Sequence, residues 1–314
     1  MFGFPGLELV PAAGRMGKYL TYEALIMQLT LLVLISAVPH LMLAQSPSPE
    51  SFVRPFRTVD SIPSPESVAI GPDGAWYVSS FGKFGVEGDG AVYRVTPENM
   101  KRELYAGGLD DPTGLLFVAE TLWVADRKGV YQVKRGGVDV IYAAASFPRR
   151  LNFLNDLASG PGGTLYVSDT GDSSSAGAVF VLKSGKRPSV LAGSDTVTAQ
   201  SSVNGLHRGR ADTLYTVGFR SGVLSVTDGH GAWRELARNL GAPDGIATAG
   251  EEGFYVTDND GGNLFLVPRA AGGAPVTLAR GLKAPADLVV DRRRGWLVIP
   301  ENQGNRLSVY RLRG

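Results

Sequence analysis

One phrase recurs six times along the chain. A polar residue opens a short apolar run, a Gly-rich turn follows, and a second apolar run ends near Ser, Thr or Asp. The clearest copy is Pro243-Asp244-Gly245-Ile246-Ala247, followed by Phe254-Tyr255-Val256-Thr257-Asp258. The opening residues, spaced 47, 42, 49, 40 and 43 positions apart, are Glu66, Thr113, Asn155, Asn204, Asp244 and Asp287. A period in the forties with several short strands per unit is typical of propeller blades.

The six repeats predict the fold. Each of the first five contains four short β-type runs, bounded by turn residues such as Pro72-Asp73-Gly74. The sixth offers only three strands, and residues 51–60 read as an extended strand placed before the first repeat. We therefore predict an all-β chain in which residues 46–314 form a six-bladed β-propeller of four-stranded blades. The N-terminal strand would join the last blade and close the ring, which leaves fewer exposed edges.

The N-terminus predicts a separate segment at residues 1–45. Residues 24–44 are uncharged and mostly apolar, with Arg15 and Lys18 before them and a polar Ser- and Pro-rich stretch after them. This layout fits a signal peptide cleaved after Ala44, or an uncleaved membrane anchor. Either way we expect an exported propeller, periplasmic or secreted or held outside the cytoplasm, that contacts membrane only through this segment.

Composition excludes several classes of partner and site. Lys and Arg number 31 against 30 Asp and Glu, and the basic residues are dispersed apart from Arg292-Arg293-Arg294 in a predicted hairpin turn. Nucleic acid is therefore not expected as a partner, and we expect a monomer. Cysteine is absent, which excludes disulfides, thiolate metal sites and a cysteine nucleophile. Any metal must be held by oxygen atoms or by the three histidines.

Four of the six opening residues form a candidate metal site. The first strand of each propeller blade lines the central channel, so residues at equivalent strand starts converge although some forty positions separate them. The four are Glu66, Asn155, Asn204 and Asp244. They offer two carboxylates and two amide carbonyls, all hard oxygen donors with a formal charge of minus two. This set suits Ca²⁺, or another divalent cation that prefers oxygen, and suits zinc poorly.

Turn formation is the competing interpretation. Asn204-Gly205 and Asp244-Gly245, taken singly, read as turns. They lie before a first strand, however, where no hairpin turn is required, and Glu66 is a poor turn and strand residue. The shared register therefore favours a metal site. Other polar residues have weaker signals: Asn152 and Asp156 as supporting partners or turn residues, Asp169 and Asp258 as hairpin residues, and His207 as a packing residue.

The sequence resembles the gluconolactonase, regucalcin and luciferin-regenerating-enzyme family of six-bladed propellers over about residues 65–310. The resemblance is carried by Pro65-Glu66, Leu154-Asn155-Asp156, Val203-Asn204-Gly205 and Pro243-Asp244-Gly245. It implies that Glu66, Asn155, Asn204 and Asp244 hold a divalent cation, usually Ca²⁺, at the floor of a substrate pocket. After Glu66 the chain has Ser67-Val68-Ala69 where the family has Gly-Pro-x-Trp, so the resemblance does not extend to sugar-lactone specificity.

The resemblance implies a Ca²⁺-dependent hydrolase, a lactonase or esterase acting on a small-molecule ester or sugar lactone. The cation would polarise the carbonyl, and Asp244 would act as general base or as nucleophile. Glu66, Asn155 and Asn204 would position the ion. Two alternatives remain open: a non-catalytic exported propeller that binds a ligand or protein around a structural metal, and a strictosidine-synthase-like enzyme, in which Glu66 would have no role.

Overall fold

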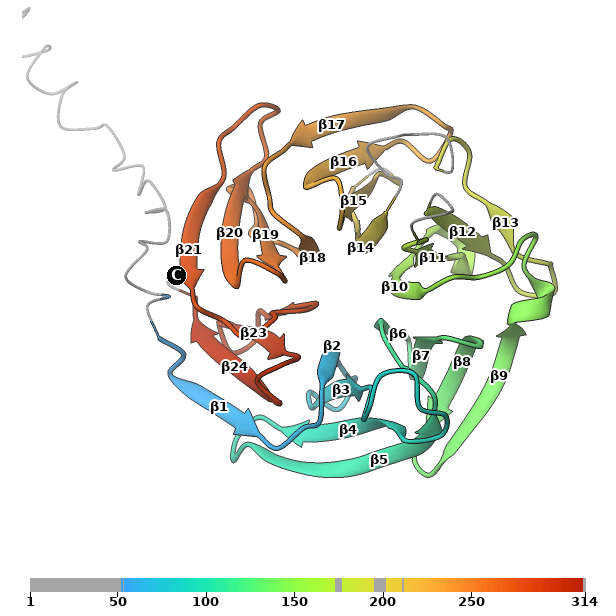
Figure 1. Ribbon diagram of the computed structural model, residues 1–314, viewed down its shortest axis with the longest axis horizontal. Helices are drawn as coiled ribbons and strands as arrows, with labels where there is room; N and C mark the ends of the chain where they lie inside the picture. The colour runs from blue at the N-terminus through green and yellow to red at the C-terminus, as the bar shows by residue number, and fades with distance from the viewer. Residues whose placement is uncertain (1–51, 53, 173–176, 195–201, 211, 313–314) are drawn as a thin grey trace, which may run out of the picture. The chain divides into compact units, whose positions relative to one another are not determined.

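Six four-stranded antiparallel sheets form a closed ring in the computed structural model (Figure 1). The structure describes residues 52, 54–172, 177–194, 202–210 and 212–312. The first three blades comprise β2 (Pro65–Ile70), β3 (Trp76–Ser80), β4 (Gly90–Thr96) and β5 (Lys101–Leu109); β6 (Leu115–Val118), β7 (Thr121–Asp126), β8 (Gly129–Lys134) and β9 (Gly137–Ala143); and β10 (Leu154–Ser159), β11 (Leu165–Asp169), β12 (Ala178–Leu182) and β13 (Ser189–Val190).

The remaining blades complete the ring and confirm the predicted architecture. They comprise β14 (Val203–Arg208), β15 (Leu214–Gly218), β16 (Val223–Thr227) and β17 (Trp233–Ala237); β18 (Pro243–Thr248), β19 (Gly253–Asp258), β20 (Asn263–Pro268) and β21 (Val276–Arg280); and β22 (Val289–Asp291), β23 (Trp296–Glu301) and β24 (Arg306–Arg311) with β1 (Arg57–Asp60). Each blade places its first strand at the hub, as Figure 1 shows for β2, β10, β14 and β18.

An N-terminal strand closes the ring, as predicted. β1 pairs antiparallel with β24, with Arg57 opposite Val309 and Asp60 opposite Arg306. The last blade therefore joins the two ends of the propeller sequence in one sheet (Figure 1). The strand is shorter than the predicted residues 51–60.

Two inner strands begin later than their repeat openers. β6 starts at Leu115 and β22 at Val289, two residues after Thr113 and Asp287. The backbone explains the difference, because amides near these openers bond to the neighbouring blade. Gly114 N donates to Asn155 O at 2.6 Å, and Asp287 N donates to Glu66 O at 3.0 Å.

The hydrophobic core is divided among the seams between blades. Six clusters of buried side chains each combine residues from two adjacent blades. Between the last and first blades, Trp76 is fully buried and packs edge-on against Trp296, with ring centroids 6.0 Å apart. Its indole Nε1 donates to Asp291 Oδ2 at 3.0 Å, which ties residues 215 positions apart in sequence. The ring is therefore stabilised blade against blade.

Replacing Trp76 by Phe is expected to lower the free energy of unfolding by roughly 1–3 kcal/mol, because it removes a buried hydrogen bond and leaves a cavity at the seam. Urea denaturation followed by circular dichroism measures the change. Trp233→Phe is the matched control, since Trp233 is partly exposed and its indole donates to Ala192 O. Equal losses in the two variants would contradict a special role for the Trp76 seam.

The predicted export segment, residues 1–45, lies outside the described residues. Within the part of the chain that the structure describes, no helix is both long and apolar enough to cross a membrane.

Candidate metal site at the mouth of the central channel

A β-bulge at the start of four inner strands aims the opening residues. In the first blade Pro65 pairs with Ser80 and Val68 with Val78, so Glu66 and Ser67 together face one residue of β3. The same irregularity follows Leu154 in β10, Val203 in β14 and Pro243 in β18. A bulge re-aims the side chain it carries. Among the inner strands, the four with bulges are the four that carry the predicted ligands.

Hydroxyl groups on the second strands hold three of these bulges. Ser79 Oγ accepts a hydrogen bond from Ser67 N at 2.9 Å. Thr257 Oγ1 accepts from Gly245 N at 2.8 Å and donates to Ala286 O of the next blade at 2.7 Å. Ser168 does the same in the third blade, bonding Asp156 N at 2.8 Å and Asn204 O at 2.7 Å. The bulges are therefore held by hydrogen bonds within and between blades.

Carboxylates at the ends of second strands hold the loops that lead to the hub. Asp169 accepts hydrogen bonds from Phe153 N at 2.8 Å and Gly171 N at 3.2 Å. Asp258 Oδ1 accepts from Ala242 N at 2.9 Å. Each of these aspartates also accepts a hydrogen bond from the turn that follows its own strand, Asp169 from Gly171 N and Asp258 from Gly261 N at 3.1 Å, which agrees with the interpretation as hairpin residues.

The glycines after Asn204 and Asp244 permit close contact between blades. A Cβ on Gly205 would lie 2.3 Å from Asp244 O, and one on Gly245 would lie 2.5 Å from Asp287 Cα. Glycine is required where backbones approach this closely. The Asn-Gly and Asp-Gly pairs therefore belong to strand starts that pack against one another, and neither forms a hairpin turn.

All four predicted ligands are buried, and three carry an oxygen with no partner. Glu66, Asn155, Asn204 and Asp244 are 4%, 4%, 3% and 6% exposed. Glu66 Oε2, Asn204 Oδ1 and Asp244 Oδ1 are buried and accept no hydrogen bond. Such atoms are costly in a protein interior unless something else binds them. A bound cation would satisfy all three.

Burial and mutual repulsion shift the pKa values of the carboxyl groups at the hub. Burial raises the pKa of Glu66 well above its usual range, with further contributions from Asp244, Asp287 and Asp156. Burial, followed by repulsion from Asp287 and Asp260, raises the pKa of Asp244 to about 8. The carboxyl groups of Glu66 and Asp244 are therefore close enough to repel each other when both are ionised. A divalent cation would favour their ionised forms.

Two further carboxylates at the hub were not among the predicted ligands. Asp156 accepts hydrogen bonds from Leu157 N and Leu206 N, both at 2.6 Å, and so ties the third blade to the fourth. Asp287 Oδ2 accepts from Ser67 Oγ at 2.6 Å. Burial raises the pKa of Asp287 to about 6. Asp156 was left open between a supporting partner and a turn residue, and its contacts join two strand starts. Asp287 is one of the six opening residues in register.

Hydrogen bonds within the protein occupy some of the oxygens at the candidate site and leave others free for an ion. Asn259 Nδ2 donates to Asp244 Oδ2 at 3.3 Å, which leaves Asp244 Oδ1 free. Within the described ranges, no three His, Cys, Asp or Glu side chains form a cluster that could hold an ion by themselves. An ion would therefore depend on the amide oxygens of Asn155 and Asn204. Such an all-oxygen set fits Ca²⁺.

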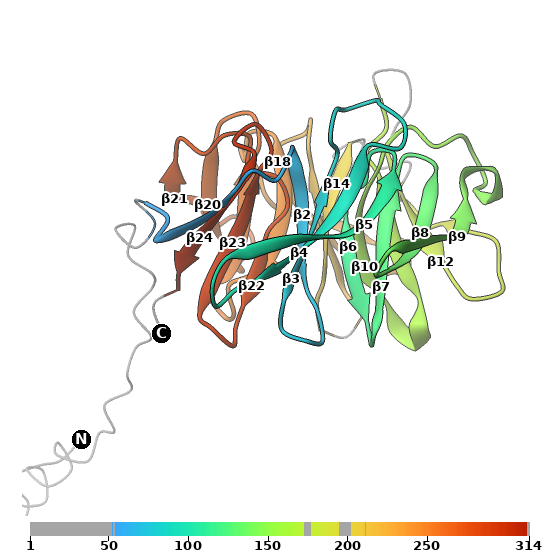
Figure 2. The same cartoon turned by 90° about the horizontal axis from the view of Figure 1, so that it is seen from below.

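Three phenylalanines form an aromatic rim at this mouth. Phe84, in the β3–β4 loop, lies 5.7 Å from both Phe81 and Phe153 between ring centroids and is 68% exposed. Phe81 follows the residue paired with Pro65, and Phe153 precedes Asn155 by two positions. The rim is therefore at the same end of the strands as the candidate ligands, and Figure 2 shows this loop rising above the ring. No sequence repeat indicated it.

Asp110 and Asp111 fix the loop that carries Phe84. Gly85 N donates to Asp111 Oδ1 at 2.8 Å and Gly88 N donates to Asp110 Oδ1 at 3.0 Å. The exposed aromatic ring is consequently held in place by the backbone that follows it.

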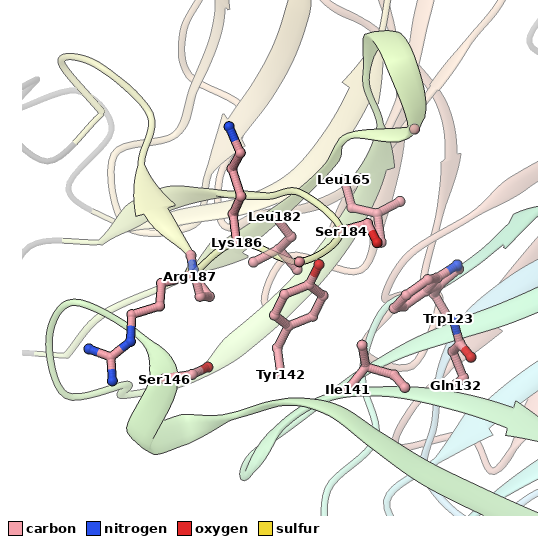
Figure 3. Close-up of a pocket in the computed structure, with 13 residues that line it drawn as sticks. Trp123, Gln132, Ile141, Tyr142, Ser146, Leu165, Leu182, Ser184, Lys186 and Arg187 are labelled. Atoms are coloured by element: carbon pink, nitrogen blue, oxygen red, sulfur yellow. The ribbon is translucent and has the colours of Figure 1, made fainter.

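A second hollow, of about 440 Å³, lies between the second and third blades (Figure 3). Trp123, Tyr142 and Leu165 line it together with Lys186 and Arg187. It contains none of the predicted ligands, and its two charged side chains are cations, so it does not suit a metal ion.

Comparison with known proteins supports the fold. No family model and no curated protein matches the chain. A solved candidate gluconolactonase is 13% identical, with a TM-score of 0.61 over 83% of this chain and 96% of that one. A streptogramin B lyase is 10% identical, with a TM-score of 0.59 over 81% and 95%.

Two other solved structures that match the fold belong to proteins of different kinds. An inactive His-to-Ala variant of virginiamycin B lyase from Staphylococcus aureus, solved with quinupristin, is 12% identical, with a TM-score of 0.57 over 82% and 99%. A nidogen/laminin complex matches at 16% identity, with a TM-score of 0.54 over 65% of this chain and 75% of that one. At these identities the likeness concerns the fold, which both enzymes and a complex-forming protein share. The chain has the six-bladed propeller fold of the gluconolactonase-like structure that its repeats resemble.

Proposed function

We propose that the protein is a Ca²⁺-dependent hydrolase of small-molecule esters or lactones. The observation that carries this proposal is the set of buried oxygens without partners on Glu66, Asn204 and Asp244. Together with Asn155 they supply two carboxylates and two amides at one end of the channel. A bound cation would supply Lewis acidity toward a substrate carbonyl oxygen.

Asp244 would be the reacting carboxylate. Asn259 holds its Oδ2, and its Oδ1 has no protein partner. Once ionised, this side chain accepts a proton from water or attacks the carbonyl carbon. Glu66, Asn155 and Asn204 would hold the ion, and the neighbouring Asp287 accepts a hydrogen bond from Ser67.

Hydrolysis of a panel of aldonolactones, aryl esters and organophosphates, before and after chelation, tests the proposal. Elemental analysis should find one Ca²⁺ per chain, and readdition of Ca²⁺ should restore activity lost to the chelator. Activity that survives both chelation and Asp244→Asn would overturn the metal mechanism.

The aromatic rim predicts a preference for substrates with an apolar group. Phe84→Ala should raise KM for aryl esters about tenfold relative to small aliphatic lactones, because it removes contact area outside the reacting centre. The value of kcat should change little. Leu104→Ala is the control, since Leu104 is 58% exposed on the outer strand β5. A fall in kcat with unchanged KM would instead place Phe84 in the chemical step.

A ligand- or partner-binding propeller with a structural metal is the second candidate. The fold likeness to a nidogen/laminin complex favours it. A Ca²⁺ ion that is present but has no coordination position open to water or substrate, with no hydrolysis of the panel, would select this candidate. A lyase is less well supported, because His207 and His230, the two histidines among the described residues, are not at the inner-strand bulges.

A further inference from the structure

The channel below the candidate metal site is an apolar cavity of about 370 Å³. All six inner strands or the turns next to them contribute to it. Its apolar lining residues are Val68, Ala69, Ile70, Leu115, Leu116, Phe117, Leu157, Leu206, Ile246, Ala247, Leu288, Val289 and Val290. Asp156 and Asp287 are the acidic residues in this lining. Most of the side chains that line the cavity are therefore apolar.

A polar cavity of about 620 Å³ adjoins the channel between the fourth and fifth blades. His207, Thr248 and Arg292 line both cavities, so the two adjoin at these side chains. The polar cavity lies at the β14–β15 and β18–β19 turns, the opposite end of the inner strands from the bulges. Both volumes are in the range of small-molecule sites.

The polar cavity carries an excess of positive charge. Four arginines and one glutamate are the lining residues that carry a formal charge at neutral pH: Arg208, Arg210, Arg269, Arg292 and Glu251. Arg208 pairs with Asp212 at 3.0 Å and Arg210 with Glu251 at 3.8 Å. Within the described ranges, Arg269 and Arg292 have no acidic side chain within 4.0 Å. Two guanidinium groups at one cavity thus lack an anionic partner.

Arg269 is held in place at the wall of this cavity. Its guanidinium carbon lies 4.8 Å from the centroid of the Phe254 ring, and its Nη2 donates to Gly250 O at 2.7 Å. Stacking and a carbonyl contact fix the group while leaving other N–H donors for a ligand. His207 packs beside it, 6.1 Å from Phe254 between centroids. Burial, with Arg269 and Arg292 adding to it, lowers the pKa of His207 to about 4.

The run Arg292-Arg293-Arg294 divides its side chains among three environments. Arg294 Nη1 pairs with Asp291 Oδ2 at 2.8 Å. Arg293 is exposed and lines neither cavity. Arg292 stands where the channel meets the polar cavity, with only a 3.5 Å contact from its Nη2 to Thr248 O. One arginine of the run is therefore positioned for a ligand.

We propose that this end of the channel binds a small amphiphilic anion. Arg269 and Arg292 bind its oxyanion head, a carboxylate or a phosphate, through charge-assisted hydrogen bonds. Its unbranched apolar chain enters the lumen lined by the inner strands. This site is independent of the proposed hydrolase, because it uses none of the candidate metal ligands.

Isothermal titration of the full chain with octanoate in EDTA buffer tests the proposal. Octanoate should bind one per chain and at least about tenfold more tightly than acetate at equal ionic strength, because each buried methylene adds free energy. Arg292→Gln should weaken octanoate binding by about tenfold or more. Arg293→Gln, which lowers the net charge by the same amount, should leave it unchanged. Both arginines are exposed, so both variants should keep the parent unfolding temperature.

Three results would overturn the site. Equal weakening by the two Arg variants would show non-specific attraction to positive charge. Equal affinity for acetate and octanoate would exclude a chain in the lumen. Equal affinity for octanoate and neutral 1-octanol would show that the arginines do not recognise the head group.

Discussion

Asp244→Asn is expected to abolish calcium binding and to lower the rate of hydrolysis at least about 100-fold, a loss typical of removing one group that stabilises the transition state electrostatically. The variant keeps the shape of the side chain and removes its charge. Its Oδ1 loses the negative charge that offsets a divalent ion, and its side chain no longer accepts a proton or attacks a carbonyl. Calcium titration calorimetry and the ester panel measure the two effects.

The same substitution should make the metal-free protein more stable by roughly 1–3 kcal/mol, since it removes a buried acidic group whose ionisation is opposed by burial and by the neighbouring Asp287 and Asp260. Loss of function with gain of stability distinguishes a site built for an ion from a structural carboxylate. Glu66→Gln should behave alike, because burial also opposes the ionisation of Glu66. Asp139→Asn is the charge-matched control on the outer strand β9 and should change neither property. Destabilisation of metal-free Asp244→Asn would contradict the assignment.

The repeat made the fold predictable. Six polar openers at spacings of 40 to 49 residues identify the blades, and a last repeat with three strands indicates closure by an earlier one. Strand starts were less predictable where a backbone amide bonds to the neighbouring blade, as at Gly114 and Asp287. The spacing of apolar residues within a repeat indicates which strands pair inside a blade. It does not indicate hydrogen bonds between neighbouring blades.

The candidate ligands were predictable because they recur in register, whereas their surroundings were not. Asp244 was found from its place in the repeat, but Asn259 and the bulge that aims Asp244 require three-dimensional contacts. Phe84 gave no sequence signal because the β3–β4 loop belongs to one blade alone. Loops that occur in one blade alone, such as the one with Phe84, have no counterpart in the other repeats, so the sequence repeat does not identify them.

The metal-free protein is expected to lose stability as pH rises from 6.5 to 8. Burial raises the pKa of Asp244 to about 8, so the folded state holds a proton that the unfolded chain has already released. Stability from such a group is complete below the unfolded pKa and is lost as pH rises through the folded value. Each pH unit in between costs up to about 1.4 kcal/mol per group.

Two other buried groups with shifted pKa values, Asp287 and His207, determine the pH range in which the effect of Asp244 can be measured. The pKa of Asp287 is raised to about 6, so its contribution has largely been lost by pH 6.5. The pKa of His207 is lowered to about 4, so this side chain makes stability rise with pH mainly between about 4 and 6.5, and its opposing effect fades over roughly the next pH unit. Between pH 6.5 and 8 the buried carboxyl groups at the candidate metal site therefore dominate the slope.

Urea denaturation in EDTA at pH 6.5, 7, 7.5 and 8 measures this slope. Saturating Ca²⁺ should remove or reverse it, because an ion that binds only the ionised carboxylates stabilises the folded state more as pH rises. Asp244→Asn should flatten it even without Ca²⁺, whereas Asp139→Asn should keep it. A metal-free stability that is constant or increases across this range would mean that Asp244 is ionised without a cation. The raised pKa of Asp244 would then no longer support a cation site next to this side chain.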